Sequence, residues 1–188
     1  MPHDTKPRRF FMNGDEWGLY DVIPAENAAY CRRIADAYRA HHKDTKFAPT
    51  GWATRPYVIP QPEVTISSRG IRVAELESII GNVMPKVAGV DSCVDYTGKP
   101  FPCPDCFGFA LSLDNYWQSE GFYGSQRGEI VQAFHVTQTL TASRTQIPAI
   151  VDAVVRLGCR FNLMLLANAD HVVDLRDTEE VAGFIDPK

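Results

Sequence analysis

Three of the five cysteines lie close together in the middle of the sequence, as Cys93, Cys103 and Cys106. The last two form a Cys-x-x-Cys motif, which places two thiolates at the separation that tetrahedral zinc requires, and Cys93 is a candidate third ligand. The candidates for a fourth ligand lie further along the chain and are His135, Cys159 and His171. One interpretation of the cysteines is therefore a zinc-binding protein or a thiol-dependent enzyme.

A structural role for the same motif is the preferred interpretation. A redox-active cysteine usually needs a helix N-terminus to lower the pKa of its thiol, whereas the residues after Cys106 alternate in the manner of a strand. Pro102 and Pro104 instead predict a tight turn that leads into this strand, with the thiols packed as small apolar groups. On this interpretation the protein needs no cofactor.

The remaining polar residues give no complete catalytic motif. His135 lies inside a predicted strand, without an Asp or Ser at a spacing that would mark it as a general base. The sequence contains no nucleophile elbow, no glycine-rich phosphate loop and no His-Glu-x-x-His helix. We therefore expect no catalytic residue, and an enzyme is the less favoured class.

An aromatic and glycine-rich segment, residues 114–128, is the more informative candidate for a binding site. Rigid aromatic side chains among glycines and small polar residues are typical of adaptable recognition surfaces, and the acidic side chains nearby would suit a basic partner such as the active site of a nuclease. The predicted partner-binding residues are Asp114, Tyr116, Trp117, Glu120, Phe122 and Tyr123. The alternative is that the aromatic rings fold back over a sheet and cover the core.

Hydrophobic periodicity predicts the helices that position these residues. Apolar side chains at three- and four-residue spacing predict helices over residues 24–42, 72–83 and 145–158. Gly158 is expected to stop the third helix, and Asp177 to cap a short final one.

The strands are predicted from alternation and from β-branched residues. Strict alternation over 107–113 and β-branched residues over 129–140 predict two strands that are joined by the loop containing the aromatic segment. A buried strand is expected over 161–167 and a short one over 64–66, while the short apolar segments on either side of the Asn13-Gly14 turn predict a strand or a hairpin near the N-terminus. These elements predict an α+β fold, with an antiparallel or mixed sheet covered by about three helices.

Length and composition limit the classes of protein that fit. A chain of 188 residues, of which 45% are hydrophobic and 22% charged, fits one globular domain, so we expect a flexible N-terminus over residues 1–8 and a single domain over 9–188. The net charge of −4 argues against nucleic-acid binding. No apolar run approaches the ~18 residues of a membrane span, and the N-terminus lacks a signal peptide. The sequence thus predicts a cytoplasmic protein with mostly reduced cysteines and no membrane or nucleic-acid partner.

Several aromatic and aliphatic segments follow one another in a characteristic order between about residues 10 and 175. They are Trp17, Tyr30-Cys31-Arg32-Arg33, Phe47-Ala48-Pro49-Thr50-Gly51-Trp52, Gly108-Phe109-Ala110-Leu111 and Phe161-Asn162-Leu163. Together they resemble the immunity proteins of bacterial polymorphic toxin systems, and more narrowly an α+β family encoded beside restriction-endonuclease-like toxins. The resemblance implies a non-enzymatic cytoplasmic protein that neutralises one cognate toxin by binding it tightly. A protein-binding immunity or inhibitor protein is therefore the leading hypothesis, and a zinc-dependent or thiol-dependent enzyme is the alternative.

Overall fold

The computed structural model describes residues 9–11, 20–44, 58, 60–92, 101–115, 118–137, 140 and 142–186. This part of the chain contains two sheets and four α-helices in a single α+β domain, which confirms the predicted fold class. None of the described helices is both long enough and apolar enough to cross a membrane.

The larger sheet has six strands in the order β5-β6-β7-β2-β8-β9, and all neighbours in it are antiparallel. These strands are β2 (Tyr20–Pro24), β5 (Cys106–Asn115), β6 (Gln118–Arg127), β7 (Ile130–Val136), β8 (Leu163–Ala167) and β9 (His171–Asp174). In the smaller sheet β3 lies between a parallel and an antiparallel neighbour. Its strands are β1 (Arg9–Phe11), β3 (Gly89–Ser92) and β4 (Phe101–Cys103).

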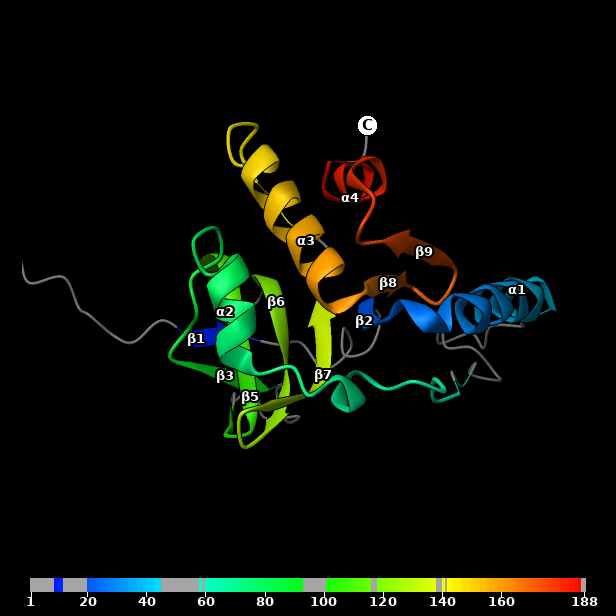
Figure 1. Cartoon of the computed structure of the whole chain (residues 1–188), viewed down its shortest axis with the longest axis horizontal. Helices are drawn as coiled ribbons and strands as arrows, with labels where there is room; N and C mark the ends of the chain where they lie inside the picture. The colour runs from blue at the N-terminus through cyan, green and yellow to red at the C-terminus, as the bar shows by residue number, and fades with distance from the viewer. Residues whose placement is uncertain are drawn as a thin grey trace, which may run out of the picture.

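The helices lie on both faces of the larger sheet. They are α1 (Ala28–Asp44), α2 (Val73–Ile80), α3 (Ile147–Phe161) and α4 (Thr178–Ile185), and two 3-10 turns, η2 (Ala25–Asn27) and η3 (Ile66–Arg69), precede α1 and α2. Figure 1 shows α1 and the α3–α4 pair on opposite sides of β2, β8 and β9.

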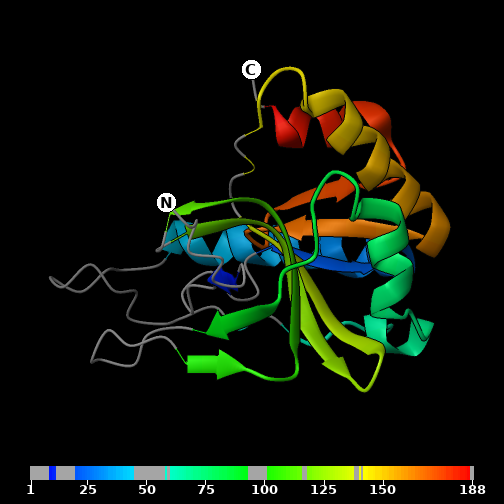
Figure 2. The same cartoon turned by 90° about the vertical axis from the view of Figure 1, so that its left-hand side faces the viewer.

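Strand β8 shows how the two faces are filled, because all five of its residues are buried. Successive side chains of a strand point to opposite faces. Leu163, Leu165 and Ala167 enter the main core under α2, α3 and α4, whereas Met164 and Leu166 enter a second core under α1. A third core joins the smaller sheet, which lies at the far end of the molecule from α3 and α4 in Figure 2, to β5 and β6. Its buried residues are Phe10, Val87, Val90, Ala110 and Tyr123.

Two of the predicted strand arrangements are wrong. The expected N-terminal strand is present as β1, but it pairs with β3 while β2 belongs to the larger sheet, so β1 and β2 do not form a hairpin, and the Asn13-Gly14 turn lies outside the described residues. The segment 64–66 leads into η3 instead of forming a strand. The side chain of Asn27 donates to the carbonyl of Val64 at 2.7 Å and accepts from its N–H at 3.1 Å, so it occupies both groups that a neighbouring strand would bind.

The loop predicted between the strands at 107–113 and 129–140 is also wrong, because β6 occupies residues 118–127. The glycines that suggested a loop serve close strand pairing instead. A Cβ atom on Gly121 would lie 2.0 Å from the carbonyl oxygen of Phe109, and one on Gly124 would lie 2.1 Å from that of Ala133. No side chain fits at either position.

The last two helices were predicted more closely. Helix α4 begins as expected, with the side chain of Asp177 accepting hydrogen bonds from the N–H groups of Glu179 and Glu180. Helix α3, however, continues through Gly158 and ends at Phe161, where Asn162 adopts a left-handed conformation with φ of 53°. Gly158 is therefore not the stop signal that the sequence suggested.

Candidate ligand pocket and apolar groove

Cys103 and Cys106 form a disulfide across the tight turn between β4 and β5. The predicted turn is confirmed, but the expectation that its cysteines stay reduced is wrong, and the bonded sulfurs offer no thiolate to zinc. Cys93 lies outside the described residues, and His135 is buried in β7. Among the residues that the structure describes, no three His, Cys, Asp or Glu side chains gather as metal ligands.

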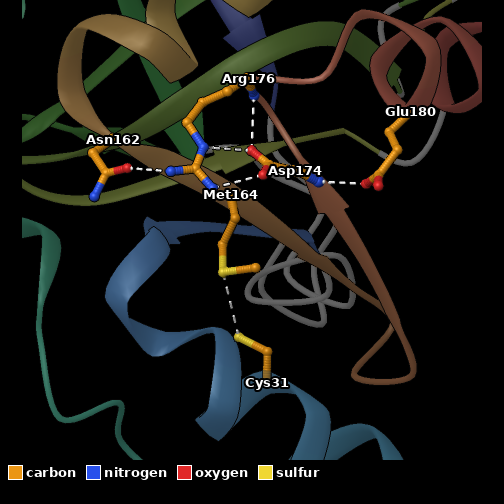
Figure 3. Close-up of polar contacts among 6 residues, drawn as sticks. All are labelled: Cys31, Asn162, Met164, Asp174, Arg176 and Glu180. Carbon is orange, nitrogen blue, oxygen red and sulfur yellow. Dashed lines mark hydrogen bonds and ion pairs between the residues drawn. The ribbon is translucent and has the colours of Figure 1, made fainter.

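The two free cysteines within the described residues have different surroundings. Burial raises the pKa of the Cys31 thiol to about 11, so this group is protonated at neutral pH, and its sulfur lies 4.0 Å from that of Met164 (Figure 3). Cys159 is exposed on α3, and His171 is exposed at the start of β9. Cys31 therefore has the character of a core residue.

Strand β6 buries the aromatic residues of the predicted partner-binding segment that the structure describes. Phe122 is 2% exposed and stacks on Phe134 with 5.2 Å between ring centroids. Tyr123 is 1% exposed, and its ring lies 5.6 Å from that of Phe10. For these two residues the structure supports the alternative interpretation, in which the rings pack in the core.

The other residues of that predicted site are only partly described. Tyr116 and Trp117 lie outside the described residues. Asp114 belongs to β5, and Glu120 is half-buried on β6. Among the residues of this site that the structure describes, no exposed aromatic surface is found.

A pocket of about 360 Å³ opens between β2 and β7 at the centre of the larger sheet. Strand β2 pairs with β8 along its whole length but with β7 only where Asp21 faces His135. Beyond this position the strand ladder stops, and Ile23 on one side and Gln132 and Ala133 on the other line the pocket. The incomplete pairing of two central strands therefore creates the space.

Asp21 and His135 form the polar end of this pocket. Nδ1 of His135 lies 2.6 Å from Oδ1 of Asp21. The histidine side chain is 7% exposed and the aspartate side chain 29% exposed. A carboxylate at Nδ1 fixes the orientation and the tautomer of the ring. The pair can accept a hydrogen-bond donor or a cation from a molecule in the pocket.

The segment that forms the outer wall of the pocket is held in place by η2 and α1. Asn27 holds both backbone groups of Val64, and the hydroxyl of Tyr30 donates a hydrogen bond to the carbonyl of Pro60. Asn27 is 2% exposed and Tyr30 is 7% exposed, so both anchors are rigid. The wall is thus held in place by two buried side chains, one from η2 and one from α1.

The lining of the pocket combines one acidic group with apolar walls. Within the described part of the chain no lysine or arginine lines it. Thr65 and Gln132 add neutral polar groups, and Ile66 and Leu166 add apolar surface. A negatively charged ligand would meet the carboxylate of Asp21 without a lysine or arginine of the lining to compensate it, so the lining favours neutral or cationic ligands.

A second cavity, of about 370 Å³, is an apolar groove between α3 and α4. The two helices lie side by side in both views (Figure 1 and Figure 2). The apolar lining consists of Ile147, Pro148, Val151, Val155 and Ala182. Asp152 and Thr178 stand at the rim, and both are exposed. Apolar residues with a polar rim are typical of a protein-protein contact.

The chain that forms the α4 wall of the groove is acidic, whereas the α3 wall carries Arg156 and Arg160 besides Asp152. Residues 170–186, from β9 through α4, contain six carboxylates and one arginine. That arginine, Arg176, donates hydrogen bonds of 2.7 and 2.6 Å to the carboxylate of Asp174, so the two charges balance each other. Asp177, Glu179 and Asp186 are exposed. The α4 wall of the groove therefore presents a negative surface, whereas on α3 the charge of Asp152 is balanced by Arg156 at 3.0 Å.

A hydrogen-bond network fixes α4 relative to α3 and β9 (Figure 3). Arg176 donates to Oδ1 of Asn162 at the end of α3, at 2.7 Å, and Glu180 of α4 accepts from the N–H of Asp174 at 2.7 Å. The bond from Arg176 holds the pKa of the Asp174 carboxyl below its usual range. The two walls of the groove are thus joined before any partner arrives.

Replacing Arg176 with alanine is expected to lower the free energy of unfolding by about 1 kcal/mol at neutral pH, as for partly exposed charge-assisted bonds. Because the folded-state pKa of Asp174 is lowered, this contribution is complete above the unfolded-state pKa of about 3.9 and is lost as the pH falls through the folded-state value. Urea denaturation of both proteins between about pH 7 and pH 2 measures the difference.

Arg156→Ala is the matched control for this experiment, since it removes an exposed pair with Asp152 at 3.0 Å within α3. It should cost no more than about 0.5 kcal/mol. A difference between wild type and Arg176→Ala that stays constant down to the lowest pH would contradict the role assigned to the Asp174 pair.

The sequence indicates some residues of the pocket and of the groove, but it does not show that they lie together. Local patterns indicate His135 only as a candidate zinc ligand or general base, because its partner Asp21 lies 114 positions earlier. The amphipathic pattern of α3 and the cap of α4 were visible, but the groove exists only where the two helices meet. Comparison of the chain with known protein families, with curated protein sequences and with solved structures found no match.

Proposed function

We propose that this chain is a non-enzymatic protein-binding domain that inhibits a basic partner, in the manner of an immunity protein that neutralises a cognate toxin. The observation that carries the proposal is the preformed apolar groove between α3 and α4 with its acidic surroundings. The resemblance of the sequence to immunity proteins supports the same function. The groove supplies apolar anchoring, and the carboxylates select a positively charged partner.

This proposal moves the binding surface away from the segment 114–128. Phe122 and Tyr123 are buried, whereas Pro148 and Thr178 of the groove are exposed. The alternative function organised around zinc or a reactive thiol gains no support from the described residues, because Cys103 and Cys106 are bonded to each other. The proposed partner is a protein whose contact surface is rich in Lys and Arg around an apolar side chain.

The test begins with native mass spectrometry of the tagged chain from its source cells, which identifies a stoichiometric partner, and continues with the two purified proteins. Ala182→Arg places a long cationic side chain in the groove and should weaken binding at least about tenfold, as for a contact near the centre of an interface. Gly183→Arg adds the same charge at the next position, which is exposed with open space around it, and should bind nearly as tightly as wild type.

The wild-type affinity should also fall as salt is raised, because the attraction between the carboxylates of the α4 wall and the partner is screened. The proposal is contradicted if the identified partner is acidic, if no stoichiometric protein is found, or if both variants bind as wild type does. Equal weakening by the two arginines would assign the effect to charge alone and would also contradict the groove.

A further inference from the structure

We propose that the pocket between β2 and β7 binds the head group of a small cation, a guanidinium or primary ammonium group on a short aliphatic chain. This site is separate from the groove and does not depend on the function proposed above. It is formed by other elements, β2, β7, β8, α1 and η3, and shares no lining residue with the groove.

The charge of the lining selects the head group. Asp21 is the carboxylate of the pocket, and its partly exposed side chain can reach a ligand while Oδ1 stays bonded to His135. No lysine or arginine of the described residues competes for it inside the pocket. A guanidinium or ammonium group on Asp21 forms a charge-assisted hydrogen bond, the strong kind, in a partly desolvated place.

The walls of the pocket determine which body the ligand can have besides its cationic head group. Ile23, Ile66 and Leu166 line the pocket with branched aliphatic side chains, and Thr65 and Gln132 offer a hydroxyl and an amide. About 360 Å³ lies at the lower end of the range for small-molecule sites. A short alkyl chain fills this space against the aliphatic wall, whereas a large ring system would exceed it.

The rigidity of the pocket favours binding, since little order has to be imposed on the protein. His135 is held by Asp21, and its ring lies 5.2 Å from the buried ring of Tyr123. The wall segment is held by Asn27 and Tyr30. A site whose parts are fixed beforehand loses less conformational entropy on binding.

The probe for the test is n-butylguanidinium, added to the ¹⁵N-labelled full chain and followed by NMR. We expect a Kd on the order of 1 mM, typical of so small a ligand, with shifts centred on Asp21, Gln132 and His135. Pentanoate, which has a similar length and the opposite charge, should not bind. Asp21→Asn should weaken butylguanidinium at least about tenfold, as expected when one partner of a desolvated charge pair is removed.

Asp177→Asn is the matched control, because it also removes one carboxylate but from the exposed N-cap of α4, where asparagine caps equally well. It should leave the Kd unchanged. If Asp21→Asn fails to fold, Ala133→Leu replaces it: the half-buried Ala133 lines the pocket, and the larger side chain should block the probe while Asp21 remains.

Binding of pentanoate as tight as that of butylguanidinium, unchanged binding by both pocket variants, or shifts confined to other surfaces would overturn the proposal. The result does not depend on any protein partner, so it can fail while the groove proposal holds, and the reverse. A guanidinium could also come from an arginine of the protein partner. If Asp21→Asn lowers the affinity for the protein partner about tenfold, the guanidinium is a side chain of that partner. If the affinity does not change, the pocket binds a free ligand.

Discussion

Replacing Phe134 with alanine is expected to lower the free energy of unfolding by about 3–5 kcal/mol, the loss usual for a fully buried phenylalanine. Phe134 is 1% exposed on β7. Its ring stacks between Phe122, at 5.2 Å, and Phe107, at 6.0 Å, so one side chain connects three strands of the main core. Urea denaturation followed by circular dichroism measures the loss, which is a large part of the 5–15 kcal/mol typical of a domain.

Phe101→Ala is the matched control, because Phe101 is 50% exposed on β4 and its removal should change the free energy of unfolding by no more than about 0.5 kcal/mol. If Phe134→Ala does not fold, Phe134→Leu fills most of the space and should retain a measurable transition with a smaller loss. Similar losses in the free energy of unfolding for Phe134→Ala and Phe101→Ala would show that the aromatic stack does not stabilise the core.

The sequence predicts those parts of the fold that depend on local patterns of residues. The stripe that includes Tyr30, Cys31 and Ile34 predicts the buried side of α1, and the apolar run over 161–167 predicts β8. Asp177 marks the start of α4 through a cap that needs only its two following neighbours. In each case the interactions that form the element lie within a few positions of one another.

The parts that escape prediction depend on distant partners. The apolar segment Arg9–Phe11 predicts a strand, but no local pattern predicts that this strand, β1, pairs with β3 about eighty positions later. Gly121 and Gly124 are typical of a loop by composition. Their place in β6 follows from the carbonyl groups of neighbouring strands, which leave no room for a side chain.

The same distinction applies to the candidate sites. The Cys-x-x-Cys spacing brings Cys103 and Cys106 close enough to bond, but spacing alone does not choose between zinc, free thiols and a disulfide. Asp21 and His135 face each other across β2 and β7, and no local sequence pattern predicts that these two strands are neighbours in the sheet. The pocket and the groove are therefore properties of the tertiary structure.

Replacing Gly158 with alanine is expected to destabilise the protein by about 1–3 kcal/mol, the usual cost of overpacking. Within a helix the same change is normally favourable by about 1 kcal/mol. Here a Cβ atom would lie 2.2 Å from the carbonyl oxygen of Leu175 and 2.4 Å from its carbonyl carbon, so α3 would have to move away from the segment that leads into α4. Chemical denaturation measures the loss, and the same movement should weaken a partner that binds the groove.

Gly183→Ala is the matched control, since Gly183 lies inside α4 with nothing within 4 Å of the added methyl group. It should stabilise the protein by about 0.5–1 kcal/mol, because alanine restricts the unfolded chain and suits a helix. The two substitutions thus have the same chemistry and opposite expected signs, which separates helix propensity from packing. Stabilisation by both would show that α3 does not pack on the backbone of Leu175, and the rigid groove between α3 and α4 would lose its physical basis.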